Sequence, residues 1–365
     1  GNYNVGFLNE GTITSSGNNN FVWLPLTADN WGGFRIMMFE NRGSITLNGT
    51  EDSISSFGSE GDEDAGGITF INNGALTLNG SKNKGLIIKR DKSYTSGEIL
   101  LNEPMKIKGN QSVGIAFLGY INLESGKNFH HSSADNVVIE LPATTRESVL
   151  KIDMSDNEKS TALYFENAGS VPFVVKNFNL KTTNSKKNNL VYVKNGIVDL
   201  DASTNGTMTI TGGEENIGIY TIATGKNLTN NGDITITNSD TSVGILASGT
   251  GTGIVTNTGK ISATGKAVRA IIASNSKVTS SGKITVNGTA LSDTVGAVGL
   301  AALEGATLTS SGADSSITVD GKSSIGVYSG GQASKVIVST AEIKATDGAF
   351  NTTAREEGVI ELGTG

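Results

Sequence analysis

Short apolar stretches recur along the whole chain, and in many of them apolar and polar residues alternate. In the segment Ile234-Thr235-Ile236 the two Ile side chains fall on one face of an extended strand and Thr on the other. No helical period or heptad is sustained, which argues against a coiled-coil stalk. The pattern therefore predicts many short, half-buried strands. Four further segments have the same position in the repeat: Ile261-Ser262-Ala263, Ile284-Thr285-Val286, Ile317-Thr318-Val319 and Ile343-Lys344-Ala345.

These strands belong to a repeated cassette that consists of an apolar strand, a turn of the form Asn-x-Gly and a second strand. Near the start, the leading apolar residues of the second strand are Ile13, Ile45, Leu76 and Ile107, which are 32, 31 and 31 residues apart. In the second half the steps are 27, 23, 33 and 26 residues. The first strand of the cassette also recurs, as Ile217-Gly218-Ile219-Tyr220, Val243-Gly244-Ile245-Leu246, Val295-Gly296-Ala297-Val298 and Ile325-Gly326-Val327-Tyr328.

A repeat of constant polarity stacks most simply with like strands on like strands, in parallel. Parallel crossovers are right-handed by strong preference. The sequence therefore predicts an all-β, right-handed parallel β-helix (a β-solenoid) of about a dozen rungs. With a rung spacing of about 4.8 Å, the rod would be about 60 Å long. We expect the Asn-x-Gly turns to use the positive φ angles that Asn and Gly tolerate.

The two halves of this single solenoid differ in composition. Both Trp, both His, all four Pro and eleven of the twelve Phe precede residue 180. Residues 1–180 hold 20 acidic and 14 basic residues, a net charge of −6, whereas residues 181–365 hold 15 and 14, a net charge of −1. Insertions on a solenoid usually form recognition loops. We therefore interpret residues 1–200 as rungs with insertions that carry a candidate recognition face, and residues 201–365 as regular scaffold.

Two insertions supply the candidate partner-binding residues. The first runs from Phe21 through Trp23 to Trp31, and its aromatic side chains could stack on sugars or anchor a protein. The alternative is that they are large core residues or an apolar lid. The second, acidic insertion runs from Glu51-Asp52 to Asp62-Glu63-Asp64 and could meet a basic partner or bind Ca²⁺ weakly. We favour a solvated, mobile charge run over either role, because EF-hand or nonapeptide spacing is absent.

The remaining composition narrows the function classes. The chain has no Cys, which excludes disulfides and Cys-ligated metal sites. The adjacent His130 and His131 would point in opposite directions in an extended segment and could not chelate one metal together. A net charge of −7 disfavours nucleic acid and anionic membrane as partners. We expect no helical membrane span, since no run of 18 apolar residues occurs. The chain opens without an initiator Met or a signal peptide, so we expect an excised piece of a longer protein.

Catalysis is not expected. A β-helix that cleaves polysaccharides needs carboxylates, with or without Arg or Lys, that converge from neighbouring rungs. The residues that follow the turn glycines are instead chemically mixed, and adjacent acids such as Glu214-Glu215 would diverge in a strand. No Gly-x-Ser-x-Gly, His-Glu-x-x-His or P-loop motif occurs. We expect neither a cofactor nor a bound metal.

The cassette of a Val/Ile-Gly-Ile strand, an Asn-x-Gly turn and an Ile-Thr strand resembles the passenger domains of type V autotransporter adhesins. The resemblance is greatest to the very large fusobacterial adhesins of the RadD type. It covers residues 205–345 best and residues 1–200 more loosely. It implies a rod on the outer face of a Gram-negative outer membrane, exported through a C-terminal barrel that lies outside this sequence. No short family motif exists from which binding residues could be carried over.

These observations favour a non-catalytic adhesin passenger that attaches the cell to other bacteria or to host cells. Its partner would be a surface protein or a glycan, and we expect the chain to be a monomer. Three alternatives stay open. The chain could be a vacuolating-toxin-like passenger that assembles laterally on membranes, a β-helix enzyme that acts on polysaccharides, or a spacer without a ligand.

Overall fold

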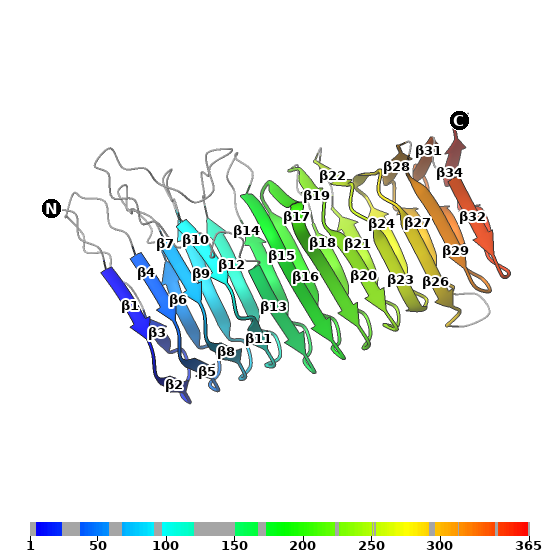
Figure 1. Cartoon of the computed structure of the whole chain (residues 1–365). Coiled ribbons are helices and arrows are strands. Elements are labelled where there is room, and N and C mark those ends of the chain that lie inside the picture. The colour runs from blue at the N-terminus through cyan, green and yellow to red at the C-terminus, as the bar shows by residue number, and fades with distance from the viewer. Residues whose placement is uncertain are drawn as a thin grey trace, which may run out of the picture.

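The computed structural model is a rod of stacked parallel strands (Figure 1). It describes residues 5–23, 37–57, 68–90, 97–119, 150–166, 173–222, 226–249, 251, 253–291, 296–312, 314–339 and 342–363. Every strand pair among these residues is parallel, and within these ranges no helix is found. The predicted all-β parallel solenoid is therefore confirmed. Its right-handed sense remains the expectation that the crossover rule gives.

The described strands of the solenoid lie on three faces. The first face contains β1 (Val5–Asn9), β4 (Met37–Asn41), β7 (Ile68–Asn72), β10 (Gly97–Leu101), the first parts of β15 (Phe173–Thr183) and β17 (Val198–Thr211), β19 (Leu228–Asn230), β22 (Ile254–Asn257), β25 (Lys277–Ser280), β28 (Thr307–Ser311), β31 (Lys335–Ser339) and β34 (Val359–Leu362). The second face contains β2 (Thr12–Ser15), β5 (Ser44–Leu47), β8 (Ala75–Leu78), β11 (Met105–Ile107), β13 (Leu150–Ser155), the second parts of β15 and β17, β20 (Asp233–Thr237), β23 (Ile261–Lys266), β26 (Ile284–Thr289), β29 (Ser316–Asp320) and β32 (Glu342–Thr346).

The third face is a single sheet of twelve strands. One strand from each turn gives about the dozen rungs that the repeat predicts. The strands are β3 (Phe21–Trp23), β6 (Ser53–Phe57), β9 (Lys84–Arg90), β12 (Val113–Gly119), β14 (Thr161–Glu166), β16 (Asn189–Asn195), β18 (Ile217–Thr221), β21 (Val243–Ser248), β24 (Arg269–Ser274), β27 (Val298–Leu303), β30 (Ile325–Gly330) and β33 (Phe350–Arg355).

The observed register confirms most of the predicted spacing and corrects two positions. The steps of 27, 23, 33 and 26 residues on the second face are all observed. The step after Leu76 was wrong, because Leu76 pairs with Met105 and Ile107 pairs with Leu78. Val295 was also wrong as a strand start, because Val298 occupies that position. Both errors follow from counting along an apolar stretch in which neighbouring residues are similar.

Large side chains fill the interior of the early turns, and smaller aliphatic ones fill the later turns. Phe7, Phe39 and Phe70 occupy one register position on the first face, and their consecutive ring centroids are 4.9 Å apart. Phe117 and Phe165 stack in the same way at 4.8 Å. Stacking like side chains along the axis buries each ring between its neighbours, so the core needs no contact beyond adjacent turns.

The corner between the first and second faces contains the Asn-x-Gly turns, which work differently from our expectation. Asn41 is fully buried and donates from Nδ2 to Oδ1 of Asn72 at 2.7 Å, while accepting from Asn9 at 2.8 Å. These Asn and Gly residues do not have positive φ angles. Gly is required instead because a Cβ on Gly74 would lie 2.0 Å from the carbonyl oxygen of Gly43. Close stacking of backbones, and not turn handedness, selects glycine here.

The corner between the second and third faces has a different construction. One residue near its tip adopts a left-handed backbone in each turn from the second to the eighth, with φ between 52° and 62°, although none of these residues is glycine. Its N–H donates to a carbonyl of the next turn, as from Lys187 to Glu214 at 3.1 Å. The ladder of hydrogen bonds therefore continues around the corner. These residues are Glu51, Lys82, Gln111, Lys159, Lys187, Glu215 and Thr241.

Candidate functional site

Phe21 and Trp23, from the first insertion, both lie on β3 and have different environments. Trp23 is half-buried and packs against the core, with its ring 5.9 Å from that of Phe7 and 5.8 Å from that of Phe39. Phe21 is 44% exposed. For Trp23 the structure therefore favours the alternative of a large core residue, whereas Phe21 remains accessible to a partner. Trp31 lies outside the described residues.

The acidic insertion begins differently from our expectation. Asp52 is fully buried, and its carboxylate accepts hydrogen bonds from the backbone N–H of Asn20 at 2.9 Å and from the Ser15 hydroxyl. Treating Asp52 as part of a solvated charge run was therefore wrong: its carboxylate joins the first two turns. Glu51 is exposed and lies 3.6 Å from Nζ of Lys82. Asp62, Glu63 and Asp64 lie outside the described residues, as do His130 and His131.

Asp52 is the first member of a polar ladder along the corner that precedes the third face. In successive turns a backbone N–H donates to the buried side-chain oxygen of the next turn, at 2.8 to 3.1 Å from Asp52 to Ser242. These side chains are satisfied and inside the rod, so they have no free polar atom to offer a ligand. The ladder comprises Asp52, Asn83, Ser112, Ser160, Asn188, Asn216 and Ser242.

The second buried carboxylate is also fully paired. Glu40 is 8% exposed. Its carboxylate accepts hydrogen bonds from Nε and Nη2 of Arg42, at 2.7 and 3.1 Å, and from the side-chain amide of Asn73 at 3.2 Å. Glu40 is therefore a structural hydrogen-bond acceptor at the first corner.

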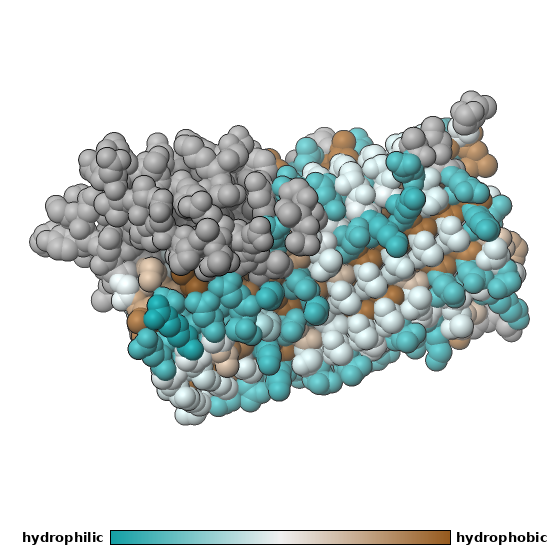
Figure 2. Space-filling model, in the orientation of Figure 1, coloured by the Kyte–Doolittle hydropathy of each residue, from teal (hydrophilic) through white to brown (hydrophobic). Residues whose placement is uncertain are grey.

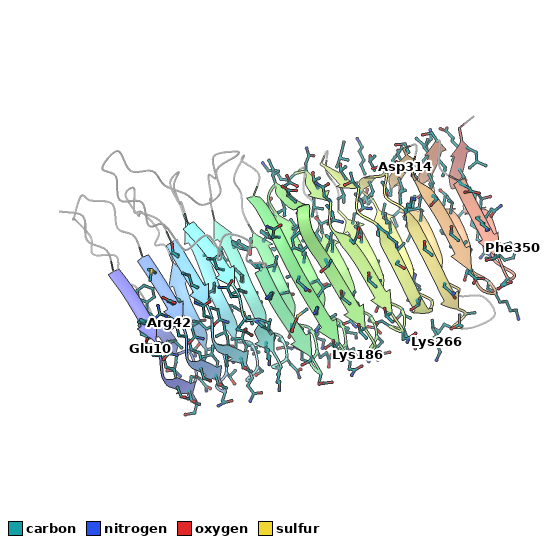
Figure 3. All side chains as sticks on the ribbon, in the orientation of Figure 1. Glu10, Arg42, Lys186, Lys266, Asp314 and Phe350 are labelled. Atoms are coloured by element: carbon teal, nitrogen blue, oxygen red, sulfur yellow. The ribbon has the colours of Figure 1, made fainter. Side chains whose placement is uncertain are left out.

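Exposed charges gather on the corner that precedes the third face. Lys186 and Glu214 form an ion pair at 2.5 Å between neighbouring turns, and Lys187 and Glu215 form another at 3.3 Å. Figure 3 shows Lys186 and Lys266 projecting from the same long edge of the rod. Nine charged residues, five acidic and four basic, follow this edge over five turns, and we call them the charged edge. They are Asp156, Glu158, Lys159, Lys186, Lys187, Glu214, Glu215, Asp240 and Lys266.

The carboxylates with shifted pKa values are stabilised as anions. A hydrogen bond from Lys159 lowers the pKa of Glu158, and hydrogen bonds from Lys194 and then Tyr164 lower the pKa of Glu166. A general acid for glycoside cleavage needs a raised pKa. In the described ranges no group of three or more potential metal-ligating side chains occurs. The arrangement thus offers paired surface charges and no constellation typical of catalysis.

The outward positions of the second face are polar. Its middle column is formed by one outward residue from each of the twelve turns. Pale residues of intermediate hydropathy run in rows over the sheet of β20, β23, β26 and β29 (Figure 2). The column contains Thr14, Thr46, Thr77, Lys106, Asp153, Lys181, Thr209, Thr235, Ser262, Thr285, Thr318 and Lys344.

The third face has an outward column of the opposite character, which we call the apolar column. Its members lie next to fully buried residues of the same strands, such as Leu163 and Ile219, and are not part of the core cluster. Three of them are themselves buried: Ile87, Ala116 and Ala301, at 7%, 2% and 5% exposed. Nine consecutive turns place an apolar or aromatic residue here. They are Ile87, Ala116, Tyr164, Tyr192, Tyr220, Leu246, Ile272, Ala301 and Tyr328.

The three central tyrosines stack along the rod. The ring centroids of Tyr164 and Tyr192 are 5.4 Å apart, and those of Tyr192 and Tyr220 are 4.9 Å apart. The Tyr164 hydroxyl donates to Glu166 at 2.7 Å, and burial, followed by this contact, raises the pKa of that hydroxyl. Our sequence analysis did not single out this column, although the 28-residue steps between these tyrosines are a usable signal.

Comparisons with protein-family models, curated proteins and solved structures found no match to this chain. Among the described residues there is no helix of the length and apolar character that crossing a membrane requires.

Proposed function

We propose that this chain is a non-catalytic segment of a bacterial surface adhesin, a rod that presents binding surfaces to other bacteria or to host cells. The location would be the outer face of a Gram-negative cell, with the chain exported as an autotransporter passenger. The ligand would be a surface protein or a glycan. Recognition would lie within residues 1–200, and residues 201–365 would serve as scaffold.

One observation carries this proposal: hydrogen bonds connect each described turn to the next along the whole rod. Pairing crosses residue 200 without a break, because β15 pairs with β17 and β17 pairs with β20. Buried Asn, Ser and Asp side chains add ladders at the corners. A rod bonded along its axis suits a part that holds a binding surface away from the cell. The hydrogen-bonded buried carboxylates of Glu40 and Asp52 favour attachment over catalysis.

The test is adherence of beads coated with the purified chain to a panel of bacteria and host cells, with a glycan array as a parallel screen. Two variants, lacking residues 24–31 and 58–64, leave β3 and β6 intact. We expect the beads to adhere and at least one deletion to reduce adherence several-fold, with an unchanged melting temperature. A matched control is Thr318→Ala on the outward second face of the scaffold half.

Two outcomes would contradict the proposal. Beads that adhere to no cell type and bind no glycan would indicate a spacer. Product release from an acidic polysaccharide, abolished by replacing a surface carboxylate, would indicate an enzyme. If adherence survives both deletions, the chain is adhesive but its recognition site has been wrongly placed.

A further inference from the structure

The apolar column extends into a broader apolar surface on the third face. Two further outward columns flank it on the same strands, and from turn seven onward they are also poor in charge. Arg269 is the one charged side chain among the described outward positions between β18 and β30. The flanking positions in these turns are Ile217, Val243, Arg269, Val298 and Ile325 on one side and Ile222, Ser248, Ser274 and Leu303 on the other.

Such a surface differs from the ordinary exterior of a soluble rod. Contiguous apolar surface rimmed by polar residues marks association sites. Here the rim is the charged edge, which runs beside the starts of β14, β16, β18, β21 and β24. The second face of the same turns presents Thr and Ser, so the composition of a solenoid exterior in general does not account for the apolar surface.

We propose that the third face binds a second copy of this chain, face to face and antiparallel, with the twofold axis between β16 and β18. The proposal does not depend on the ligand or on the adhesive function. It replaces our sequence-based expectation of a monomer. Stacking of successive turns gives the apolar column a repeat of about 4.8 Å along the rod axis. A second copy supplies a surface with the same repeat.

The charges favour this arrangement. The twofold axis places turn six of each copy opposite turn seven of the other. Lys186 and Lys187, which form ion pairs with Glu214 and Glu215 of their own copy, then also face Glu214 and Glu215 of the partner. The same contact recurs on the other side of the axis. Lys159 faces Asp240 in the next pair of turns. The five acids and four bases of the charged edge nearly balance, so two copies approach with little net repulsion along it, despite the net charge of −7.

Side-chain sizes along the apolar column are also complementary in this register. Tyr192 meets Tyr220 of the partner at the centre, and Tyr164 meets Leu246. Opposing large and small residues allows two sheets to interdigitate at the density of a protein interior.

The area is sufficient for a specific dimer. The six strands from β12 to β24 span about 29 Å along the axis, and about six residues of each strand span about 20 Å across it. Each copy would bury about 600 Å² and the pair about 1,200 Å², the lower end of the range for specific interfaces. Affinity in the micromolar range is the expectation.

The test exploits the absence of cysteine from the chain. Tyr164→Cys and Leu246→Cys are made separately and then oxidised alone or as an equimolar mixture. The proposal predicts that the mixture forms a disulfide-linked dimer several-fold faster than either variant alone. Faster linking of Tyr164→Cys to itself would overturn the antiparallel register.

A second experiment tests the charge contacts. The double variant Lys186→Glu, Lys187→Glu should abolish the concentration-dependent dimer in sedimentation velocity. Adding Glu214→Lys and Glu215→Lys should restore it. Melting curves of each variant separate loss of association from loss of folding.

Wild-type chain that stays monomeric up to about 100 µM overturns the proposal. So does saturable binding of the monomer to phosphatidylcholine vesicles through the tyrosines, which would identify a lipid surface as the occupant.

Discussion

The second and third faces of this rod share an interior and differ on the outside. Inward, both place fully buried aliphatic residues in register from turn to turn, such as Ile234 and Ile245. Outward, the second face carries Thr, Ser and Lys, whereas the third carries Tyr, Leu, Ile and Ala. Folding requires only the inward pattern. The requirements of folding therefore do not explain the difference between the outward residues of the two faces. We interpret the apolar outward residues of the third face as an association surface.

The largest expected effect tests the shared interior. Ile236→Asp on the second face and Ile245→Asp on the third should each lower the free energy of unfolding by about 4 kcal/mol or more, because each buries an unpaired carboxylate. The outward neighbours Thr235→Asp and Leu246→Asp should change it by about 0.5 kcal/mol or less. Urea unfolding followed by circular dichroism provides the measurement. Unequal losses at the two inward positions would contradict the claim that the faces are equivalent inside.

The interior is also the part that the sequence predicted best. Alternation in segments such as Ile284-Thr285-Val286 identified the inward residues, because burial on one face of a strand imposes a period of two. The reason for the turn glycines could not be predicted, because their clash partner lies one full turn away in the sequence. The strand that starts at Arg269 was missed as well, since a charged residue stands where other turns have Val or Ile.

The candidate site was predicted less well. Phe21 and Trp23 were identified as aromatic, but only the ring contacts with Phe7 and Phe39 place Trp23 against the core. The apolar column escaped notice because the third-face strands place two consecutive residues inward, as Gly218 and Ile219 are. That irregularity breaks the simple alternation from which outward residues are inferred.

The second and third faces can also be compared by the steric cost of adding a Cβ to one of their glycines. A Cβ on Gly259, at the corner before the second face, would lie 2.0 Å from the carbonyl oxygen of Gly232. On the third face, a Cβ on Gly244 would lie 2.6 Å from that of Ala270. We expect Gly259→Ala to cost about 3 kcal/mol and Gly244→Ala about 2 kcal/mol, because each forces backbones apart. Gly6→Ala is the control, since its nearest neighbour would be at 3.9 Å; an equal loss there would refute the steric explanation.

A smaller effect is expected at the corner that joins the two faces. Thr241 has φ 52°, a conformation that β-branched residues adopt rarely. Thr241→Asn should raise the free energy of unfolding by about 1 kcal/mol, because Asn tolerates the left-handed region. The matched substitution is Thr235→Asn, on an ordinary extended residue, which should be neutral or slightly destabilising. A gain at Thr235 equal to that at Thr241 would show that backbone strain is not the cause.

The smallest expected effect is a pH dependence on the third face and its edge. The pKa values of Glu158 and Glu166 are lowered from 4.5 in the folded chain, so their contribution to stability is present above that value. It is lost as the pH falls through the lowered folded pKa. Both groups are exposed and their ion pairs are screened, so the decrease should be slight and smaller in high salt.

Glu166→Gln should reduce this loss of stability at low pH, as measured by the melting temperature between pH 6 and about pH 3. If the substitution leaves the decrease in melting temperature unchanged, Glu166 does not contribute to the pH dependence.

The most direct test of the difference between the faces is sedimentation velocity on a matched set of lysine substitutions. Tyr220→Lys and Leu246→Lys alter the third face, and Thr209→Lys and Thr235→Lys alter the second face of the same two turns. We predict a reversible dimer for the wild-type chain, loss of that dimer in both third-face variants, and its retention in both second-face variants. A chain whose association responds equally to both pairs, or that does not associate, would contradict the account.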